Sequence, residues 1–172
     1  YLTYTDGTVD IEQNYRFEGE LPELPRLGLN FMLGEQYGNI SWYGRGPIES
    51  YPDRKEATYI GRWESTLEEQ YTPYPRPQDG GNHEEVTDVR LTDHRGRGIR
   101  SSAIDTPFSF SALPYTAEDL AGATHDCELV PRKQVVVSID AAVLGLGNSS
   151  CGPGVLKKYV IEKKKEHRLR VR

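Results

Sequence analysis

The sequence has little of several things that would place a chain in a familiar class. Its 172 residues contain two cysteines, Cys127 and Cys151, which are too few for a disulfide framework. We expect two free thiols, so cysteine usage leaves the cellular compartment undecided. No apolar run approaches the ~20 residues that a membrane-spanning helix needs, and no signal-like apolar segment opens the chain. We therefore expect no membrane partner.

Positive charge is also scarce. The chain carries 21 Lys and Arg against 26 Asp and Glu, a formal net charge of −5. This balance argues against a general phosphate-binding surface, so we expect no nucleic-acid partner. The densest basic run, Lys163 to Arg168, is predicted to be an exposed hairpin turn between two late strands rather than a tail that binds nucleic acid.

Methionine and long helical patterns are the remaining absences. The chain begins at Tyr1 and its only methionine is Met32, which suggests a piece cut from a longer protein. No apolar stripe at helical spacing extends beyond two turns. One short helix is expected near residues 117–122, where Thr116 can serve as the N-cap with Asp119 as its partner.

What the sequence does contain is an alternation of apolar and polar residues, for example at Val135, Val137 and Ile139, which is typical of half-buried strands. Turns are frequent, since the chain has 17 Gly and 11 Pro. We therefore predict an all-β fold, a sandwich of antiparallel sheets. The predicted strands are 8–19, 27–33, 40–43, 57–64, 84–92, 99–103, 108–113, 128–130, 134–140, 156–161 and 168–171.

The densest group of chemically capable residues is the run WYGRGPIESYPDR, from Trp42 to Arg54. Its glycines and proline predict a tight turn that ends a strand. The run could be a sugar subsite, with aromatic faces stacked on the sugar and Arg and Asp bonding its hydroxyls. It could instead be an ordered loop held by ion pairs and tyrosine hydroxyls, and chemistry alone favours that second interpretation. The candidate residues are Trp42, Tyr43, Arg45, Glu49, Tyr51, Asp53 and Arg54.

Other patterns assign no catalytic residue and no metal ligand. Glu49 and Asp53 could be the paired acids of glycoside hydrolysis, which lie roughly 5–9 Å apart, but 26 acids produce such pairs by chance. His125 and Cys127 lie two apart, and no second cluster completes a zinc site. A Ser-His-Asp triad lacks its G-x-S-x-G elbow. The glycine-rich run 145–150 lacks the Lys and the helix of a phosphate-binding loop, so it is predicted to be a surface loop.

Several motifs then occur in a recognisable order. LPRLGLNFML (24–33) precedes WYGRGPIESYPDR, and the later motifs are YTPY (71–74), PQDGGN (77–82), FSFS (108–111), YTAEDL (115–120), His125 and GLGNSSCGPGV (145–155). From about residue 24 to about residue 161, this order closely resembles the C-terminal β-sandwich, or small-chain domain, of bacterial β-galactosidases of glycoside hydrolase family 2.

The resemblance implies a fold and a place in a larger enzyme. It implies a galactose-mutarotase-like super-sandwich, of which residues 1–172 form the later part of one domain, incomplete on its N-terminal side. The family hydrolyses terminal β-D-galactosyl bonds with retention of configuration. Its two catalytic glutamates and its magnesium site lie in an upstream (β/α)₈ barrel. We therefore expect no catalytic residue, no cofactor and no hydrolase activity in this segment alone.

The resemblance also implies partners, namely the upstream domains and a β-galactoside substrate at a shared rim. The loop residues nearest to substrate would be Asn148, Ser149, Ser150 and Cys151. Cys151 stands where family members carry a tryptophan wall, and a cysteine cannot supply a stacking platform of ~200 Å². Ser50 stands where many members have asparagine, so a hydrogen bond across its loop is expected to be lost or rerouted. A homo-oligomer stays open, as do bacterial cytoplasm and periplasm.

Two other classes of function stay open. One is a stand-alone carbohydrate-binding module with Trp42, Tyr43, Arg45 and Asp53 as its sugar platform, which burial of Trp42 and Tyr51 would exclude. The other, from fold analogy alone, is an aldose-mutarotase-like enzyme, which would need a glutamate base and a histidine in a cleft.

Overall fold

The fold consists of short strands joined by tight turns. The computed structural model describes residues 1–147 and 152–172. No helix in this described part is long and apolar enough to cross a membrane. The helix is α1 (Ala117–Gly122), and 3₁₀ turns lie at η1 (Glu35–Tyr37), η2 (Glu68–Gln70), η3 (Asp126–Glu128) and η4 (Lys157–Tyr159). The strands are β1 (Leu2–Thr3), β2 (Val9–Tyr15), β3 (Arg26–Gly34), β4 (Asn39–Gly46), β5 (Tyr59–Thr66), β6 (His83–Val86), β7 (Asp88–Thr92), β8 (Gly98–Ser102), β9 (Phe108–Leu113), β10 (Gln134–Val143) and β11 (His167–Val171).

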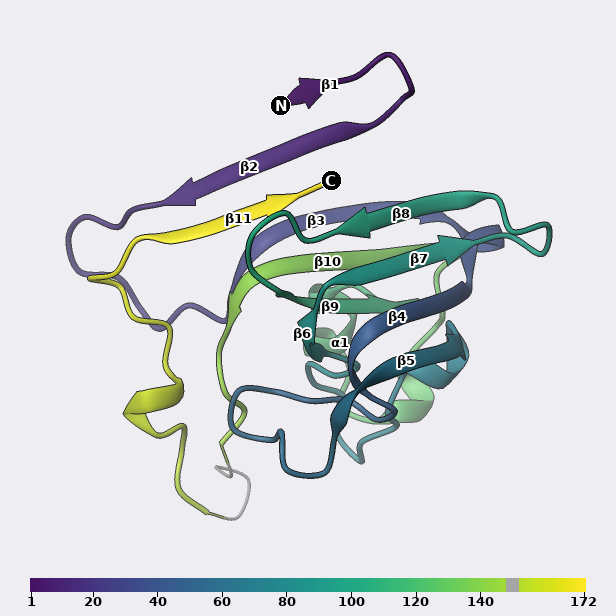
Figure 1. The fold of residues 1–172 in the computed structure, drawn as a ribbon. Helices are drawn as coiled ribbons and strands as arrows, with labels where there is room; N and C mark the ends of the chain where they lie inside the picture. Colours follow the sequence, from purple (N-terminus) through teal and green to yellow (C-terminus); the bar gives the residue numbers. More distant parts are fainter. Residues whose placement is uncertain (148–151) are drawn as a thin grey trace.

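These strands form antiparallel sheets, so the prediction of an all-β antiparallel sandwich is confirmed. One four-stranded sheet has the order β3-β10-β9-β6, and a second has the order β5-β4-β7-β8. Figure 1 shows the second sheet lying in front of the first, with the three-stranded sheet β1-β2-β11 above both. The first and last strands of the chain, β1 and β11, thus belong to one sheet and lie on either side of β2.

The hydrophobic core lies between the two four-stranded sheets. Phe110 of β9 and Val137 and Ile139 of β10 face Trp42 of β4 and Val89 of β7, and all five are at most 1% exposed. Alternate residues of a strand point to the same face, so the period of two in the sequence delivers these side chains to one side. Removing their apolar surface from water is the main favourable contribution to folding.

On the opposite face of the β3-β10-β9-β6 sheet, the part formed by β9 and the adjoining half of β10 is also buried and is mainly polar, whereas Asn30 and Met32 of β3 are exposed there. All six residues of β9 are buried, and Ser109 and Ser111 alternate with the core-facing Phe108 and Phe110. Asp140 of β10 lies directly opposite Ser109 and is 2% exposed. Buried polar atoms need hydrogen-bond partners, so this face determines where the charged loops of the chain settle.

The strand predicted at residues 128–130 is wrong. Glu128 ends the 3₁₀ turn η3, and Val130 is 80% exposed. The Glu128 carboxylate accepts hydrogen bonds from the backbone N–H groups of Thr124 and His125, which stabilises the turn. Leu129 packs against the cluster of Leu113, Tyr115 and Leu120, but no described strand pairs with this segment, so its alternation does not produce a strand.

The strand predicted at residues 156–161 is wrong as well. The turn η4 occupies its centre, and Leu156 is exposed. The basic run 163–168 therefore does not join two strands as a hairpin turn. It leads instead into β11, which begins at His167 and pairs with β2.

The strand predicted at residues 84–92 is two strands. β6 and β7 belong to different four-stranded sheets, and the chain crosses between them at Thr87. Glu85 has a φ of 58°, a backbone conformation in which no other described residue except glycine is found. A period of two continues across such a crossover, so the sequence pattern does not reveal it.

The short helix is confirmed together with its cap. The Thr116 hydroxyl accepts from the Asp119 backbone N–H at 3.2 Å, and the Thr116 N–H donates to the Asp119 carboxylate at 2.8 Å. Arg132 donates to the same carboxylate. Leu120 is buried against Tyr115, which attaches the helix to the end of β9.

Candidate functional site

The run WYGRGPIESYPDR begins in β4 and continues as the loop that follows it. The backbone of β4 directs Trp42 into the core, where its indole Nε1 donates to the Arg45 carbonyl at 2.9 Å. Across the sheet, Trp63 of β5 donates to the Gly44 carbonyl at 3.1 Å. The glycine is required there, because a Cβ on Gly44 would lie 2.7 Å from the side chain of Val86. Both indoles therefore hold the end of β4, with Trp42 buried and Trp63 partly buried.

A histidine that sequence reasoning did not select lies against this end of β4. The His83 ring packs on Trp42 with 4.2 Å between ring centroids. Its Nδ1 is 3.2 Å from the Arg45 carbonyl oxygen, and its Nε2 is 2.9 Å from the side-chain oxygen of Gln70. Burial lowers the pKa of His83 to about 4, so the ring is neutral at physiological pH. A neutral, fully enclosed ring of this kind is a packing element.

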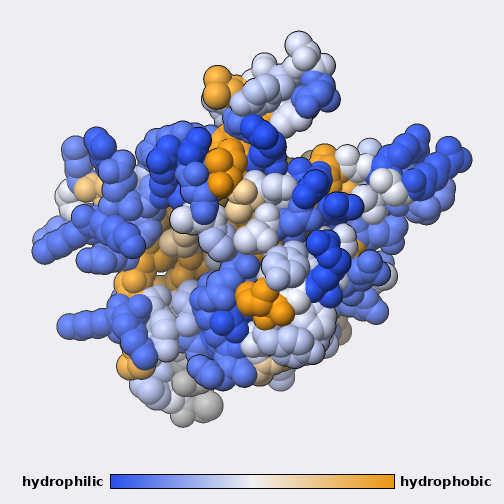
Figure 2. All heavy atoms as spheres, viewed as in Figure 1, coloured by the Kyte–Doolittle hydropathy of each residue, from blue (hydrophilic) through white to orange (hydrophobic). Residues whose placement is uncertain are grey.

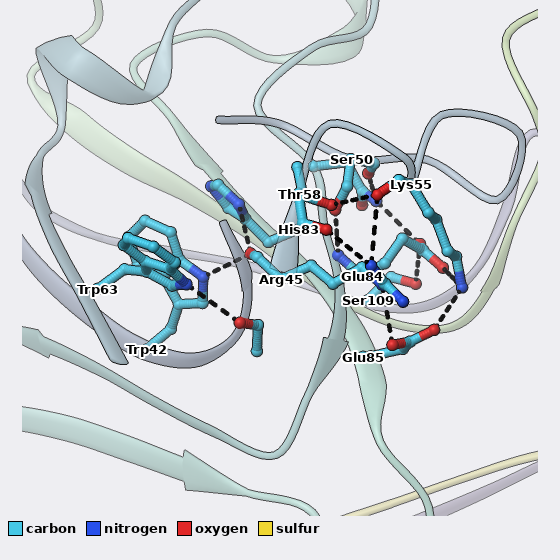
Figure 3. A network of polar contacts seen from close by, with 12 residues as sticks. Trp42, Arg45, Ser50, Lys55, Thr58, Trp63, His83, Glu84, Glu85 and Ser109 are labelled. Carbon is cyan, nitrogen blue, oxygen red and sulfur yellow. Dashed lines mark hydrogen bonds and ion pairs between the residues drawn. The ribbon is translucent and has the colours of Figure 1, made fainter. Parts of the chain in front are cut away.

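The guanidinium of Arg45 extends to the side of the strand opposite from Trp42 and enters a group of charges (Figure 3). Its Nε donates to Glu85 at 2.8 Å, and Lys55 donates to the other oxygen of the same carboxylate at 2.9 Å. Burial would raise the pKa of Glu85, but the two cations outweigh burial and hold the pKa below its usual value. These contacts stabilise the unusual backbone at Glu85.

Glu84 points to the opposite side and lies at the centre of a buried network (Figure 3). Its carboxylate accepts from the Ser109 hydroxyl at 2.6 Å and from the Asn82 amide at 3.0 Å. Lys55 lies 3.3 Å from its second oxygen. This network joins the loop after β4 to the polar face of β9.

Ser50, the departure from the family motif, takes part in the same network. Its hydroxyl accepts from the Glu84 backbone N–H at 2.9 Å, and its carbonyl accepts from the Asn82 amide at 2.8 Å. Its own N–H donates to the Asn82 carbonyl at 2.6 Å. The short serine side chain therefore still bridges the loop to β6.

Glu49 and Arg54 form a second set of contacts in the loop. The Glu49 carboxylate accepts from the Gly81 N–H at 2.8 Å and is hydrogen-bonded to the Tyr74 hydroxyl. Arg54 lies 3.5 Å from Glu49 and donates to Tyr74 at 3.3 Å. Gly81 has a φ of +68°, which only glycine adopts readily, and this conformation turns its N–H toward the carboxylate.

Tyr51 connects the loop to a third set, centred on Arg26. The Tyr51 side chain is fully buried, and its hydroxyl donates to Asp79 at 3.0 Å. Burial, reinforced by the charge of Asp79, raises the pKa of Tyr51 well above its usual value. Arg26 donates to the same Asp79 carboxylate at 3.2 Å and to the Ser111 hydroxyl at 3.2 Å. Its guanidinium also lies 3.3 Å from Asp140.

Asp140 is the most deeply buried acid of this set. Burial raises its pKa to about 6, and the charges of Asp79 and Glu84 add to that rise, while Arg26 opposes it. Its only ion-pair partner among the described residues is Arg26. Ionisation of a buried acid such as Asp140 lowers the free energy of unfolding, and the positive charge of Arg26 offsets part of that loss.

Asp53 links the loop after β4 to a distant part of the chain. Its carboxylate accepts from the Leu146 N–H at 3.0 Å and from the Gly147 N–H at 2.7 Å, so both oxygens bind the start of the late glycine-rich loop. A Cβ on Gly145 would lie 2.9 Å from the Asp53 carboxyl group and equally close to Tyr159. The loop thus approaches Asp53 closely because residue 145 has no side chain.

The burial of the aromatic side chains bears on the two interpretations of the motif. Trp42 and Tyr51 are inside the molecule, so a sugar platform built on Trp42 is wrong. Tyr43 alone among the aromatic candidates is exposed, at 42%, with the Arg62 guanidinium over its ring. Every charged candidate, Arg45, Glu49, Asp53 and Arg54, is engaged by the chain's own backbone or side chains.

The remaining predicted residues belong to the late loop and to the His125–Cys127 segment. Asn148, Ser149, Ser150 and Cys151 lie outside the described residues. His125 contacts Glu128 at 2.9 Å, and Cys127 is an exposed free thiol. Within residues 1–147 and 152–172, no group of three or more His, Cys, Asp or Glu side chains is placed to hold a metal ion.

The fold and its loop define a β-sandwich domain whose charged motif is used for its own packing and for holding a late loop. Comparison with known proteins agrees, since a family model described as the β-galactosidase small chain matches residues 1–172. The chain therefore belongs to the β-galactosidase small-chain family.

Named relatives cover most of this chain. It is 35% identical over 141 residues to a β-galactosidase of Streptococcus thermophilus, a match that covers 82% of this chain and 14% of that protein. It is 37% identical over 151 residues to the β-galactosidase BgaC of Bifidobacterium adolescentis, covering 86% and 14%. It is 34% identical over 173 residues to a β-galactosidase of Lactobacillus delbrueckii, covering 99% and 17%. The chain thus spans about a sixth of these relatives or less.

Proposed function

We propose that this chain is a non-catalytic segment of a retaining β-galactosidase that hydrolyses terminal β-D-galactosyl bonds. The catalytic glutamates and the magnesium ion would lie in an upstream barrel domain. This segment would pack beside that barrel and present its late loop, residues 145–155, at the rim of the active site. The family match and the names of the relatives support the parent activity.

The observation that carries the rim role is the contact of Asp53 with the loop. Two backbone N–H groups, of Leu146 and Gly147, are fixed on one carboxylate directly before residue 148. A loop that only connected two elements would not need a part-buried carboxylate to bind both N–H groups at its first turn. Asp53 in turn belongs to a loop tied to the sandwich through Glu49, Ser50 and Tyr51. The motif therefore acts as a rigid support for the late loop.

The proposal predicts that the chain alone neither hydrolyses nitrophenyl β-galactoside nor binds galactose at micromolar concentration. Isothermal titration calorimetry with galactose and a chromogenic assay measure both. Micromolar binding of galactose, or turnover by the chain alone, would contradict it. No observation favours the carbohydrate-binding module, because the tryptophan of its platform is buried.

The role of Asp53 has its own test. Asp53→Asn replaces one accepting oxygen by an amide group, so the loop loses one of its two anchors. We expect faster amide hydrogen exchange at Leu146 and Gly147 and, in the complete enzyme, a several-fold change in KM for nitrophenyl β-galactoside. Glu56→Gln is the matched control, because Glu56 is an exposed acid of the same loop. Unchanged exchange in Asp53→Asn would remove the support role.

A further inference from the structure

In the part of the chain that the structure describes, β5 is an edge strand. It is the terminal strand of the β5-β4-β7-β8 sheet, and within the described residues it pairs with β4 alone. Figure 1 shows no strand beyond it on the outer side. The opposite edge, β8, is partly covered, because the Ser102 N–H donates to the Arg172 carbonyl next to β11. An edge strand presents a row of backbone N–H and C=O groups to any chain that can pair with it.

Several of the protections that edge strands usually carry are missing from β5, and its charged side chains are Arg62 and Glu64 alone. Its sequence, YIGRWEST, contains neither proline nor lysine, and its register with β4 runs without a bulge from Tyr59 to Thr66. Apolar side chains are exposed along it, with Tyr59 at 64% and Ile60 at 43%. Figure 2 shows that most of the surface on one face is hydrophilic. The eight-residue edge of β5 differs from it in carrying exposed apolar side chains.

The charges of β5 are complementary to themselves. Arg62 and Glu64 lie on the same face, two residues apart, and neither is in an ion pair within the described part of the chain. When two copies of a strand pair antiparallel, residues opposite each other face the same side. If Trp63 lies opposite its own copy, Arg62 of each chain lies opposite Glu64 of the other. If the two-fold axis lies at residue 62 instead, Arg62 lies opposite its own copy. If it lies at residue 64, Glu64 lies opposite its own copy.

We propose that β5 is an interaction surface for a second copy of this chain. Two copies pair their β5 strands antiparallel about a two-fold axis at Trp63, which joins the two β5-β4-β7-β8 sheets into one continuous sheet. Two Arg62–Glu64 cross-strand pairs select this register. The backbone pairing spans residues 60–66 of each chain, a small contact, so the association is weak and depends on concentration. This inference goes beyond the proposed function and does not depend on it.

Analytical ultracentrifugation of the 172-residue chain tests the proposal. The weight-average mass is expected to rise from 19.5 kDa toward twice that value as the concentration increases. Arg62→Glu sets two acidic side chains against each other across the pair, and Glu64→Arg does the same with two basic ones. Each single variant should weaken the association more than about tenfold, because facing like charges cost several kcal/mol. The double variant, R62E with E64R, restores the complementary pairs and should associate as the wild type does.

Arg95→Glu is the matched control, since Arg95 is exposed in the β7–β8 turn, and β4 separates β5 from that hairpin in the sheet. It changes the net charge equally and should leave the association unchanged. Circular dichroism and the unfolding midpoint show that each variant is folded. A chain that stays monomeric at millimolar concentration overturns the proposal. So does a dimer that R62E leaves intact, or a double variant that remains as weak as the single variants.

Discussion

Charged side chains pair in two regions of this molecule under opposite conditions. At the three-stranded sheet, Arg16 lies 3.3 Å from Glu166, and Glu12 lies 2.9 Å from Arg168. The exposed fractions of these four side chains range from 43% to 80%. Around the loop after β4, the carboxylates of Glu49, Glu84 and Asp140 are less than a tenth exposed.

The difference shows which charges support structure. An ion pair in water gains little, because solvent screens it and two flexible side chains must be ordered. A buried charge has no such alternative, so losing its partner leaves an uncompensated charge in the interior. The buried set therefore fixes the loop after β4 against the β3-β10-β9-β6 sheet, whereas the outer sheet depends on backbone pairing and on apolar residues such as Leu169.

Removing Arg26 should have the largest effect. Arg26→Ala leaves Asp140 without its ion-pair partner and Asp79 with the Tyr51 hydroxyl alone. We expect a loss of about 3–5 kcal/mol in the free energy of unfolding at pH 7, measured by urea denaturation. Adding Asp140→Asn to Arg26→Ala should recover part of that loss. If the double variant is no more stable than the single one, Asp140 is not the charge that Arg26 compensates.

The pH dependence of Asp140 sharpens the comparison. Its folded-state pKa of about 6 lies above the usual aspartate value of 3.8, so its favourable contribution is full below pH 4 and disappears as the pH rises through 6. Asp140→Asn removes this dependence. Relative to the variant, the wild type should lose up to about 3 kcal/mol between pH 4 and pH 7, measured by denaturation at each pH.

A second buried group, His83, also makes the stability depend on pH, and comparing the wild type with Asp140→Asn controls for it. The pKa of His83 is lowered by burial, so His83 contributes the opposite slope, and its contribution is lost as the pH falls from about 6.5 to about 4. Wild type and Asp140→Asn share His83, and its effect cancels in the difference between them. A difference that is constant with pH would show that Asp140 is ionised throughout this range.

Ser50→Ala should have a smaller effect. It removes the acceptor of the buried Glu84 N–H and leaves that donor unsatisfied, which costs about 1–3 kcal/mol. Ser65→Ala removes a hydroxyl whose hydrogen bond, to the Thr66 carbonyl, lies at the surface. This variant should leave the free energy of unfolding nearly unchanged. Equal unfolding midpoints for the two variants would mean that the loop after β4 does not depend on the Ser50 bridge.

The strands were largely predictable, because the alternation that marks them is the same property that buries one face of a sheet. The motif order also indicated the family, and Thr116 with Asp119 marked the helix start. The failures at residues 128–130 and 156–161 share one cause, since a strand needs a partner and local pattern does not show whether one is available. The crossover at Thr87 was hidden for the same reason.

The supporting contacts were less predictable. Within the motif, only Arg54 and Glu49 pair with each other, as neighbouring Arg and carboxylate side chains were expected to do. Arg45 pairs instead with Glu85 of β6, and Asp53 binds the backbone of residues 146 and 147, so most of the contacts that order the loop come from distant segments. Arg26, Asp79 and Asp140 were missed, because they come from three distant segments. A signal for Asp140 was present, since an aspartate in the apolar run VVVSID is unexpected unless a cation meets it.

The smallest effect is expected at the outer sheet. Arg16→Ala removes a pair in which Arg16 is 80% exposed, so its unfolding midpoint should match that of the wild type. Salt separates the two regions further, because about 1 M NaCl reduces the screening length to about 3 Å. Wild type and Arg16→Ala should then remain indistinguishable, while the deficit of Arg26→Ala persists, since solvent ions do not reach Asp140. A deficit of Arg26→Ala that vanishes in salt would place its pairing in water and remove the contrast between the two regions.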